Sequence, residues 1–593
     1  MEINLTRRQT LILALMYSAT LSGCCHVRSK IRPYCPTSPA ISYLDGPLTI
    51  DTHCHVFNGS DLHISPFLSR VLIHDGDGAV ARAFEALTDF IQNISWALAP
   101  RGERELMELA LLTSCEDEFA TNQSSDAKAR VYEYGGAGAL RQRAHSAGRE
   151  ELQAAAKRTP QLQTLLRLYG ASQLTALDEA TQTKLAAALM IEKIPEKVED
   201  YIDTRSDKAF SVMSLSEKSA SGIINFLLQN FQYRYVSVHD YLRTYNVPGK
   251  RVVDLMLPSM VDYDWWLAEG RSTQTTLSVQ IQVAEQISIL TGGRVHAFVP
   301  FDPLKQVAFE LYGTGEDSLG VAKRAILSHG CVGIKLYPPM GFAALGNTDL
   351  RMPSGNNFWA RDWLPDLTDR PDIGQRLDNA MRELFAWCVD AQVPIMAHTN
   401  ISNGVTSEFE ELAGAKYWAK ALHDYPNLRI SFGHFGGLGS EKGLNHSKEF
   451  AKLMSAAPGA PGQFAYADAA YISEVLNGDP KILEALEDIY DRTAMKRSAA
   501  LANRFMYGTD WEMTLAHGNV GGYLSDWANL LQAMEARPAI KQAGLVGLSD
   551  KFFGLNAAEW IGLRQGEESR RRLNAFYAAN GVSPPDWAMK IDA

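Results

Sequence analysis

Two histidines separated by a single residue are the first sign of chemistry in this chain. His53 and His55 stand in "IDTHCHVF", residues 50–57, directly after a short apolar run that predicts a buried strand. Side chains alternate along a strand, so both imidazoles would point to one side and Cys54 to the other. Two imidazoles on one face can bind a divalent ion, whereas Cys54 is expected to pack between layers. With 14 histidines in 593 residues, however, such a pair also arises by chance.

Four further residues able to bind metal or move protons follow apolar, β-branched runs later in the chain. They are Lys335, His398, His434 and Asp510. Taken singly, each has an ordinary explanation: a histidine can be a hydrogen-bonded core residue, and Asp510 can cap a helix. Their positions at the ends of the fourth, fifth, sixth and eighth predicted strands together favour one shared metal site instead.

The elements that must position these residues alternate regularly. After a first strand at 47–58, β-branched or apolar runs recur between longer helical patterns. The remaining predicted strands lie at 251–258, 294–303, 331–339, 393–400, 428–437, 463–472 and 504–513. Eight strands with a crossover between each pair predict the α/β class and a (β/α)8 TIM barrel. In such a barrel the carboxyl ends of the strands share one face, so these residues would converge there.

The predicted domains follow from the spacing of these strands. The barrel comprises residues 47–58 and 250–562, a large and mostly helical insertion spans 59–249, and a tail spans 563–593. The insertion leaves the barrel after the first strand, on the face that carries the site, and can shape the pocket. It could equally be a cap without catalytic consequence or a dimerisation surface, which leaves a homo-oligomer open.

The first residues have the layout of an export signal: two arginines, an apolar run and small residues before a cysteine. "LSGC", residues 21–24, resembles a bacterial lipobox. The sequence therefore predicts a signal peptide at 1–23, lipidation of Cys24, a tether at 24–46 and a lipid anchor on the periplasmic side of a membrane in a Gram-negative-type cell. A simple cleaved signal is the alternative. "TRRQTL" resembles a twin-arginine signal, so the export route stays open.

The overall composition is that of an ordinary globular protein. Apolar residues make up 46% of the chain and charged residues 21%. The net charge of -11 provides no general attraction to phosphate backbones. Nucleic acid is therefore not an expected partner, and a small-molecule substrate is.

Five segments together resemble the signature segments of the amidohydrolase superfamily. They are "IDTHCHVF", "PIMAHTN", "LRISFGHFGG", "MYGTDWEM" and "FFGLNAAEW". The similarity is to the amidohydrolase-related (amidohydrolase 2) branch, which includes aminocarboxymuconate-semialdehyde decarboxylase-like enzymes, and it does not cover the insertion. It implies that His53, His55, His398 and Asp510 bind metal, with His434 as the catalytic histidine beside them.

Lys335 has two interpretations. "GIKLYPP" is similar to the dihydroorotase strand whose lysine is carboxylated and bridges two ions, and in that arrangement His398 and His434 would hold the second ion. Alternatively, Lys335 pairs with a carboxylate or contacts an anionic substrate.

Imidazoles and a carboxylate suit zinc, with manganese or iron as alternatives. The resulting prediction is a metal-dependent hydrolase that attacks an amide, ester or lactone with a metal-activated water. Asp510 would take the proton of the water, and His434 would steady the oxyanion or protonate the leaving group. The alternative is a non-oxidative decarboxylase of a small carboxylic acid. A metal-binding lipoprotein without catalysis ranks below both.

Overall fold

The computed structural model describes residues 46–67, 92, 96, 99–110, 230, 233–245 and 251–593, with short gaps at 314, 403, 439–440, 473–479, 513 and 515–519. The predicted signal peptide, the tether with Cys24 and most of the insertion lie outside these residues.

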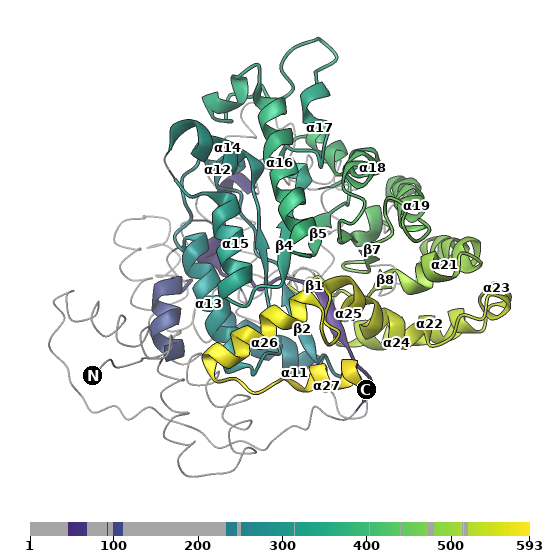
Figure 1. The fold of residues 1–593 in the computed structure, drawn as a ribbon. Coiled ribbons are helices and arrows are strands. Elements are labelled where there is room, and N and C mark those ends of the chain that lie inside the picture. Colours follow the sequence, from purple (N-terminus) through teal and green to yellow (C-terminus); the bar gives the residue numbers. More distant parts are fainter. Residues whose placement is uncertain are drawn as a thin grey trace, which may run out of the picture.

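Eight parallel strands form the centre of the molecule (Figure 1). They are β1 (Ile50–Cys54), β2 (Leu255–Pro258), β3 (Phe298–Pro300), β4 (Gly333–Leu336), β5 (Ile395–His398), β6 (Ile430–Gly433), β7 (Ala465–Asp468) and β8 (Phe505–Met506). β1 pairs with β2, and β3 to β8 pair in chain order. Parallel bridges at Met256–Val295 and Ser259–Phe298 connect β2 to β3.

Backbone hydrogen bonds between the last strand and the first close the sheet. The Thr52 N–H donates to the Tyr507 carbonyl at 3.1 Å, and the Asp510 N–H donates to the His53 carbonyl at 2.8 Å. The His55 N–H donates to the Trp511 carbonyl at 3.3 Å. With both neighbours of every strand accounted for, the predicted (β/α)8 barrel is confirmed.

Helices surround the strands (Figure 1). The longer ones are α11 (Arg234–Thr244), α13 (Leu277–Leu290), α14 (Pro303–Tyr312), α15 (Ser318–Ser328), α16 (Ile373–Asp390), α18 (Ala415–Asp424), α19 (Glu441–Met454), α21 (Pro480–Ala494), α22 (Tyr523–Glu535) and α26 (Glu568–Asn580). The shorter ones are α2 (Ile64–Pro66), α12 (Asp264–Ala268), α17 (Ser407–Glu410), α23 (Pro538–Gln542), α24 (Leu548–Asp550), α25 (Asn556–Ile561) and α27 (Asp586–Asp592). None of the helices in the described part of the chain has the length and apolarity needed to span a bilayer.

Two aspartates start consecutive helices after β3. Asp302 and Asp317 are the N-caps of α14 and α15, where their Oδ1 atoms accept from the Leu304 N–H at 2.8 Å and the Gly320 N–H at 2.9 Å. Pro303 occupies the first turn of α14, where no N–H is required. Asp302 therefore sets the start of α14 directly after β3, and Asp317 sets the start of α15 after α14.

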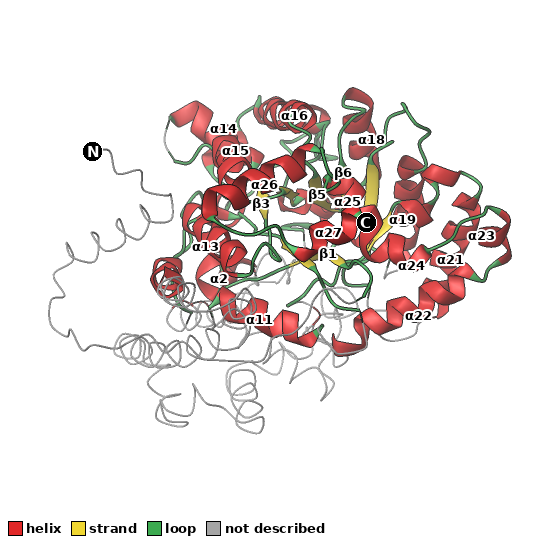
Figure 2. Ribbon diagram, turned by 60° about the horizontal axis from the view of Figure 1, so that its bottom comes forward, coloured by secondary structure: helices red, strands yellow, loops and turns green. Residues whose placement is uncertain are grey.

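The predicted C-terminal tail forms two helices that close the amino-terminal end of the barrel. The Trp587 Nε1–H of α27 donates to the Gly293 carbonyl at 2.8 Å, and Tyr577 of α26 hydrogen-bonds His296 at 2.6 Å. Figure 2 turns this end forward, with α27 in front of the strands. Since this end is covered, the predicted site residues are expected at the opposite end.

A register shift in β1, between Asp51 and Cys54, redirects its side chains. Cys54 is buried in the large core cluster outside the barrel, as expected. Asp51 accepts from the Tyr241 hydroxyl of α11 at 2.7 Å and from the Thr509 hydroxyl at 2.6 Å. The bulge leaves His53 directed at the carboxyl end of the barrel, where it meets residues of β4 and β7.

Candidate metal centre

Three of the predicted ligands come together at the seam between the first and the last strand. His53 and His55 come from the end of β1, and Asp510 follows β8. All three are buried, and one ligand atom from each lies within 4.8 Å of the others. These residues are far apart in the sequence, and they become neighbours in space because β8 pairs with β1.

The other predicted residues lie against this group. His398 ends β5 and His434 follows β6, and their Nδ1 and Nε2 atoms are 3.1 Å apart. The His434 ring centroid is 4.7 Å from that of His53. Lys335 of β4 places its Nζ 3.0 Å from His53 Nε2. The structure thus brings all six predicted residues into one buried cluster.

The hydrogen bonds of His53 and His55 indicate which nitrogen of each ring carries the proton. His53 Nδ1 lies 3.1 Å from Asp468 Oδ1, and His55 Nδ1 lies 2.9 Å from the Ser259 carbonyl oxygen. Because a carboxylate and a carbonyl only accept, we assign the proton to Nδ1 in both rings. Each Nε2 then has a lone pair directed at the site, as in metal-binding histidines held by outer acceptors.

The same reasoning applies to the remaining pair. His434 Nδ1 donates to the Ala470 carbonyl at 2.9 Å, so His434 Nε2 accepts from the Nδ1–H of His398. His398 Nε2 is therefore left with a lone pair, and it is buried without a hydrogen-bond partner. Tyr337 stacks on the His398 ring, with the centroids 4.2 Å apart.

Asp510 has an unusual backbone and an unsatisfied oxygen. Its φ of 52° is in the left-handed region, which is uncommon outside glycine and concentrated at functional sites. Its Oδ1 lies 3.4 Å from His55 Nε2 and has no hydrogen-bond partner. Two acceptors facing each other need a proton or a cation between them. Together with the unpartnered His398 Nε2, this donor set fits a divalent ion.

Electrostatics keep the histidines in the form that binds metal. Burial and the nearby Lys335 lower the pKa of His53 and His55 well below the ordinary value, so both imidazoles are neutral. Burial raises the pKa of Asp510 to about 7, against the opposing charge of Lys335. Burial lowers the pKa of Lys335 to about 8, against the opposing charge of Asp468.

Asp468 is a site residue that the sequence analysis missed. It ends β7, and its Oδ1 accepts from the His434 N–H at 3.0 Å and lies beside His53 Nδ1. Its Oδ2 accepts from the Ser431 hydroxyl at 3.3 Å. Its position at the end of the seventh strand, level with the other site residues, was the available signal.

A buried ion cluster, also missed, connects the insertion to the loop after β1. Arg234 of α11 pairs with Asp61 and with Glu105, and its Nε–H donates to Asp61 Oδ2 at 2.9 Å. Glu512, near Asp510, accepts from the Phe57 N–H at 2.8 Å. The described parts of the insertion therefore hold the loop that begins at the metal centre.

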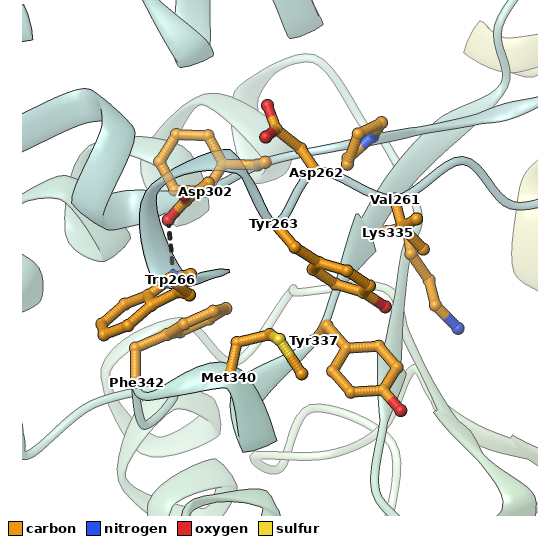
Figure 3. Close-up of a pocket in the computed structure, with 11 residues that line it drawn as sticks. Val261, Asp262, Tyr263, Trp266, Asp302, Lys335, Tyr337, Met340 and Phe342 are labelled. Atoms are coloured by element: carbon orange, nitrogen blue, oxygen red, sulfur yellow. Dashed lines mark hydrogen bonds between the residues drawn. The ribbon is translucent and has the colours of Figure 1, made fainter. Parts of the chain in front are cut away.

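A narrow cavity opens beside the centre, between the ends of β2, β3 and β4. Figure 3 shows Asp302 and Trp266 at one end of it and Lys335 at the other, with Tyr263 and Tyr337 between them. The cavity therefore borders the metal centre through Lys335.

Comparisons with known proteins give one family and several structures. The amidohydrolase family model matches residues 313–563. No curated protein matched the sequence. A TIM-barrel protein from Bordetella bronchiseptica is 12% identical, with a TM-score of 0.33, over 56% of this chain and 83% of that one. An amidohydrolase II is 11% identical, with a TM-score of 0.31, over 55% of this chain and 87% of that one.

A protein from Lactobacillus casei described as a metal-dependent hydrolase is 10% identical, with a TM-score of 0.34, over 90% of this chain and 99% of that one. The barrel itself is established by the strand pairing. The segment that matches the amidohydrolase family model contains β4 to β8 and includes His398, His434 and Asp510. The chain is thus similar to the amidohydrolase family over residues 313–563, and the seam of its barrel carries a His-His-Asp group that could hold a metal ion.

Proposed function

We propose that the protein is a metal-dependent hydrolase that cleaves an amide, ester or lactone of a small molecule. The observation that carries this proposal is the buried group of His53, His55 and Asp510, whose ligand atoms lie within 4.8 Å of one another. His398, with its unpartnered Nε2, is the fourth ligand in this proposal. Zinc is the ion that suits three neutral imidazoles and a carboxylate.

A divalent ion bound there would supply Lewis acidity, polarising a carbonyl group and lowering the pKa of water. The side chains of the protein supply the proton transfers. Burial places the pKa of Asp510 at about 7, in the range where a carboxyl group both accepts and releases protons. Burial also lowers the pKa of His434 to about 4, so this imidazole is neutral, and its Nε2 accepts the Nδ1–H of His398.

Lys335 serves in this proposal as a buried cation beside the reacting carbonyl. Its Nζ is 3.0 Å from His53 Nε2 and 3.4 Å from Met396 Sδ. Such a group can stabilise negative charge that develops on a substrate oxygen. The carboxylated form, which would bridge two ions, is tested directly by the metal stoichiometry.

The test combines elemental analysis of the purified chain with turnover of a panel of amides, esters, lactones and aromatic carboxylic acids. The variants are His55→Ala and Asp510→Asn, and the control is His423→Ala, a surface histidine whose side chain is 82% exposed. We expect one ion per chain, loss of both metal and hydrolysis in the two site variants, and neither loss in the control.

Three results would contradict parts of this proposal. A chain without metal after purification and after zinc loading would refute the site. Two ions per chain would favour the carboxylated Lys335. Release of carbon dioxide from a carboxylic acid, without hydrolysis of any member of the panel, would identify a decarboxylase instead.

A further inference from the structure

A buried carboxylate oxygen without a hydrogen-bond partner lies outside the metal centre. Asp302 follows β3 and is 2% exposed. Its Oδ1 accepts from the Leu304 N–H at 2.8 Å and from the Trp266 Nε1–H at 3.0 Å. Its Oδ2 has no partner. Capping of α14 explains Oδ1, but leaving a buried carboxylate oxygen unpaired destabilises the protein unless another group meets it.

This carboxylate lines the same cavity that reaches the metal centre. Lys335 lines the cavity and places its Nζ 3.0 Å from His53 Nε2. Tyr337 lines it and stacks on the His398 ring at 4.2 Å. In Figure 3 these two residues stand across the cavity from Asp302. A ligand in the cavity would therefore have one end at the metal centre and the other at Asp302.

The walls between the two ends are mostly aromatic. Tyr263 and Tyr337 meet edge to face with centroids 5.3 Å apart, and Trp266 stacks with Phe342 at 6.3 Å. Aromatic faces attract cations as well as apolar groups. The cavity as it stands has room for little more than a water molecule, so a larger ligand requires its walls to move, and Met340 is the flexible side chain in those walls.

The neighbouring Asp262, unlike Asp302, has a hydrogen-bond partner at each of its two carboxylate oxygens. Asp262 Oδ2 accepts from Lys305 Nζ at 2.7 Å, and its Oδ1 accepts from the Asp264 N–H at 3.2 Å. Lys305 also contacts Glu316 at 3.0 Å. Lys305 is thus engaged by Asp262 and Glu316, whereas Asp302 Oδ2 has no hydrogen-bond partner.

We propose that this cavity selects substrates that carry a protonated amine, which pairs with Asp302 Oδ2 while the carbonyl group lies at the metal centre. The pairing of the amine with Asp302 is inferred from the cavity alone. The position of the carbonyl group at the metal centre depends on the proposed hydrolase function. Burial and the charge of Asp262 raise the pKa of Asp302 to about 8, and a bound ammonium group would offset both effects.

The test measures binding of benzylamine and of benzyl alcohol to the full purified chain by ligand-observed NMR. The two probes share a ring and differ in charge. Asp302→Asn removes the charge, and because asparagine caps helices well, α14 keeps its start. Asp302→Ser is a second variant that also caps. The control is Asp317→Asn, which makes the same change at the N-cap of α15, outside the cavity.

We expect the parent to prefer benzylamine, and both Asp302 variants to bind it about tenfold more weakly or worse, as expected for loss of a charge-assisted contact. Binding of benzyl alcohol should change little, and Asp317→Asn should match the parent for both probes. Equal binding of the two probes by the parent, or unchanged benzylamine binding in the Asp302 variants, would overturn the proposal.

The two proposals fail separately. If the chain holds no metal and hydrolyses nothing, yet binds benzylamine through Asp302, the amine-binding proposal is supported and the hydrolase proposal is refuted. If the metal-loaded chain is a hydrolase but its benzylamine binding does not depend on Asp302, the hydrolase proposal is supported and the amine-binding proposal is refuted. In a working hydrolase, Asp302→Asn should reduce the preference in kcat/KM for amine-bearing over neutral substrates.

Discussion

Replacing Gly433 with alanine should weaken metal binding although it replaces none of the proposed metal ligands. Gly433 ends β6 with a φ of -57°, so alanine is compatible with its backbone. A Cβ there would lie 2.9 Å from the Ala397 carbonyl oxygen and 3.0 Å from Cε1 of His53. Ordinary contacts of this kind begin at 3.4 Å, so the ring must move by roughly 0.4 Å (3.4 minus 3.0).

The size of the expected loss in zinc affinity depends on which atoms shift to relieve these contacts. The contact at 2.9 Å is with a backbone oxygen of the sheet, so β6 must shift there, and the contact at 3.0 Å displaces His53, whose Nδ1 is held by Asp468 at 3.1 Å. Overpacking of this size typically costs about 1–3 kcal/mol. If that cost falls on the ligand geometry, zinc affinity drops by about 5- to 150-fold, since 1.4 kcal/mol is a factor of ten.

The assay is a competition between the purified chain and a chelator of known zinc affinity, for the parent, Gly433→Ala and a control. The control is Gly521→Ala, where an added Cβ meets nothing within 4 Å. Melting temperatures of the metal-free proteins report any general loss of stability. Parental zinc affinity in Gly433→Ala would refute the reasoning, because His53 would then not be a ligand in the position described.

Three further predictions concern other parts of the chain. His434→Asn should keep its zinc and lose about 10²- to 10⁴-fold in turnover, and parental turnover would make this histidine structural. Cys24→Ala should move the protein from the membrane to the soluble fraction, and unchanged fractionation would exclude lipidation. Asp302 has a pKa raised to about 8 from 3.8, so it stabilises the fold at low pH and loses that contribution as pH rises toward 8. Asp302→Asn should therefore melt increasingly above the parent between about pH 5 and 8; a constant difference in melting temperature would contradict this.

The strands and the candidate site residues were predictable because both follow from local sequence patterns. The predicted site residues all lie at the carboxyl ends of strands, as His398 does in "PIMAHTN" and Lys335 in "GIKLYPP", whereas β2 and β3 contribute none of them. The convergence of the site residues then follows from the fold. Asp468, at the end of β7, obeys the same rule, although the sequence analysis did not single it out.

The features that could not be predicted depend on contacts between distant segments. The bulge in β1 arises where Asp51 meets Tyr241 and Thr509, and no periodicity indicates it. The pairing of Arg234 with Asp61 joins positions 173 residues apart. The role of Asp302 likewise appears only when the neighbouring strands and the Trp266 side chain are in place, since in the sequence it is an ordinary helix cap.

The closure of β8 onto β1 has a consequence for biogenesis. Thr52 and Tyr507, which hydrogen-bond across the seam, are 455 residues apart, so during synthesis the first strand has an open edge until nearly the whole chain exists. An unpaired edge is a hazard for association with other chains. The ion site spans this same seam, so an ion held by His53 and Asp510 would staple the first strand to the last. Metal loading would then be the step that locks a finished barrel, and cells short of zinc should accumulate the chain in a form that proteases can cut at the seam.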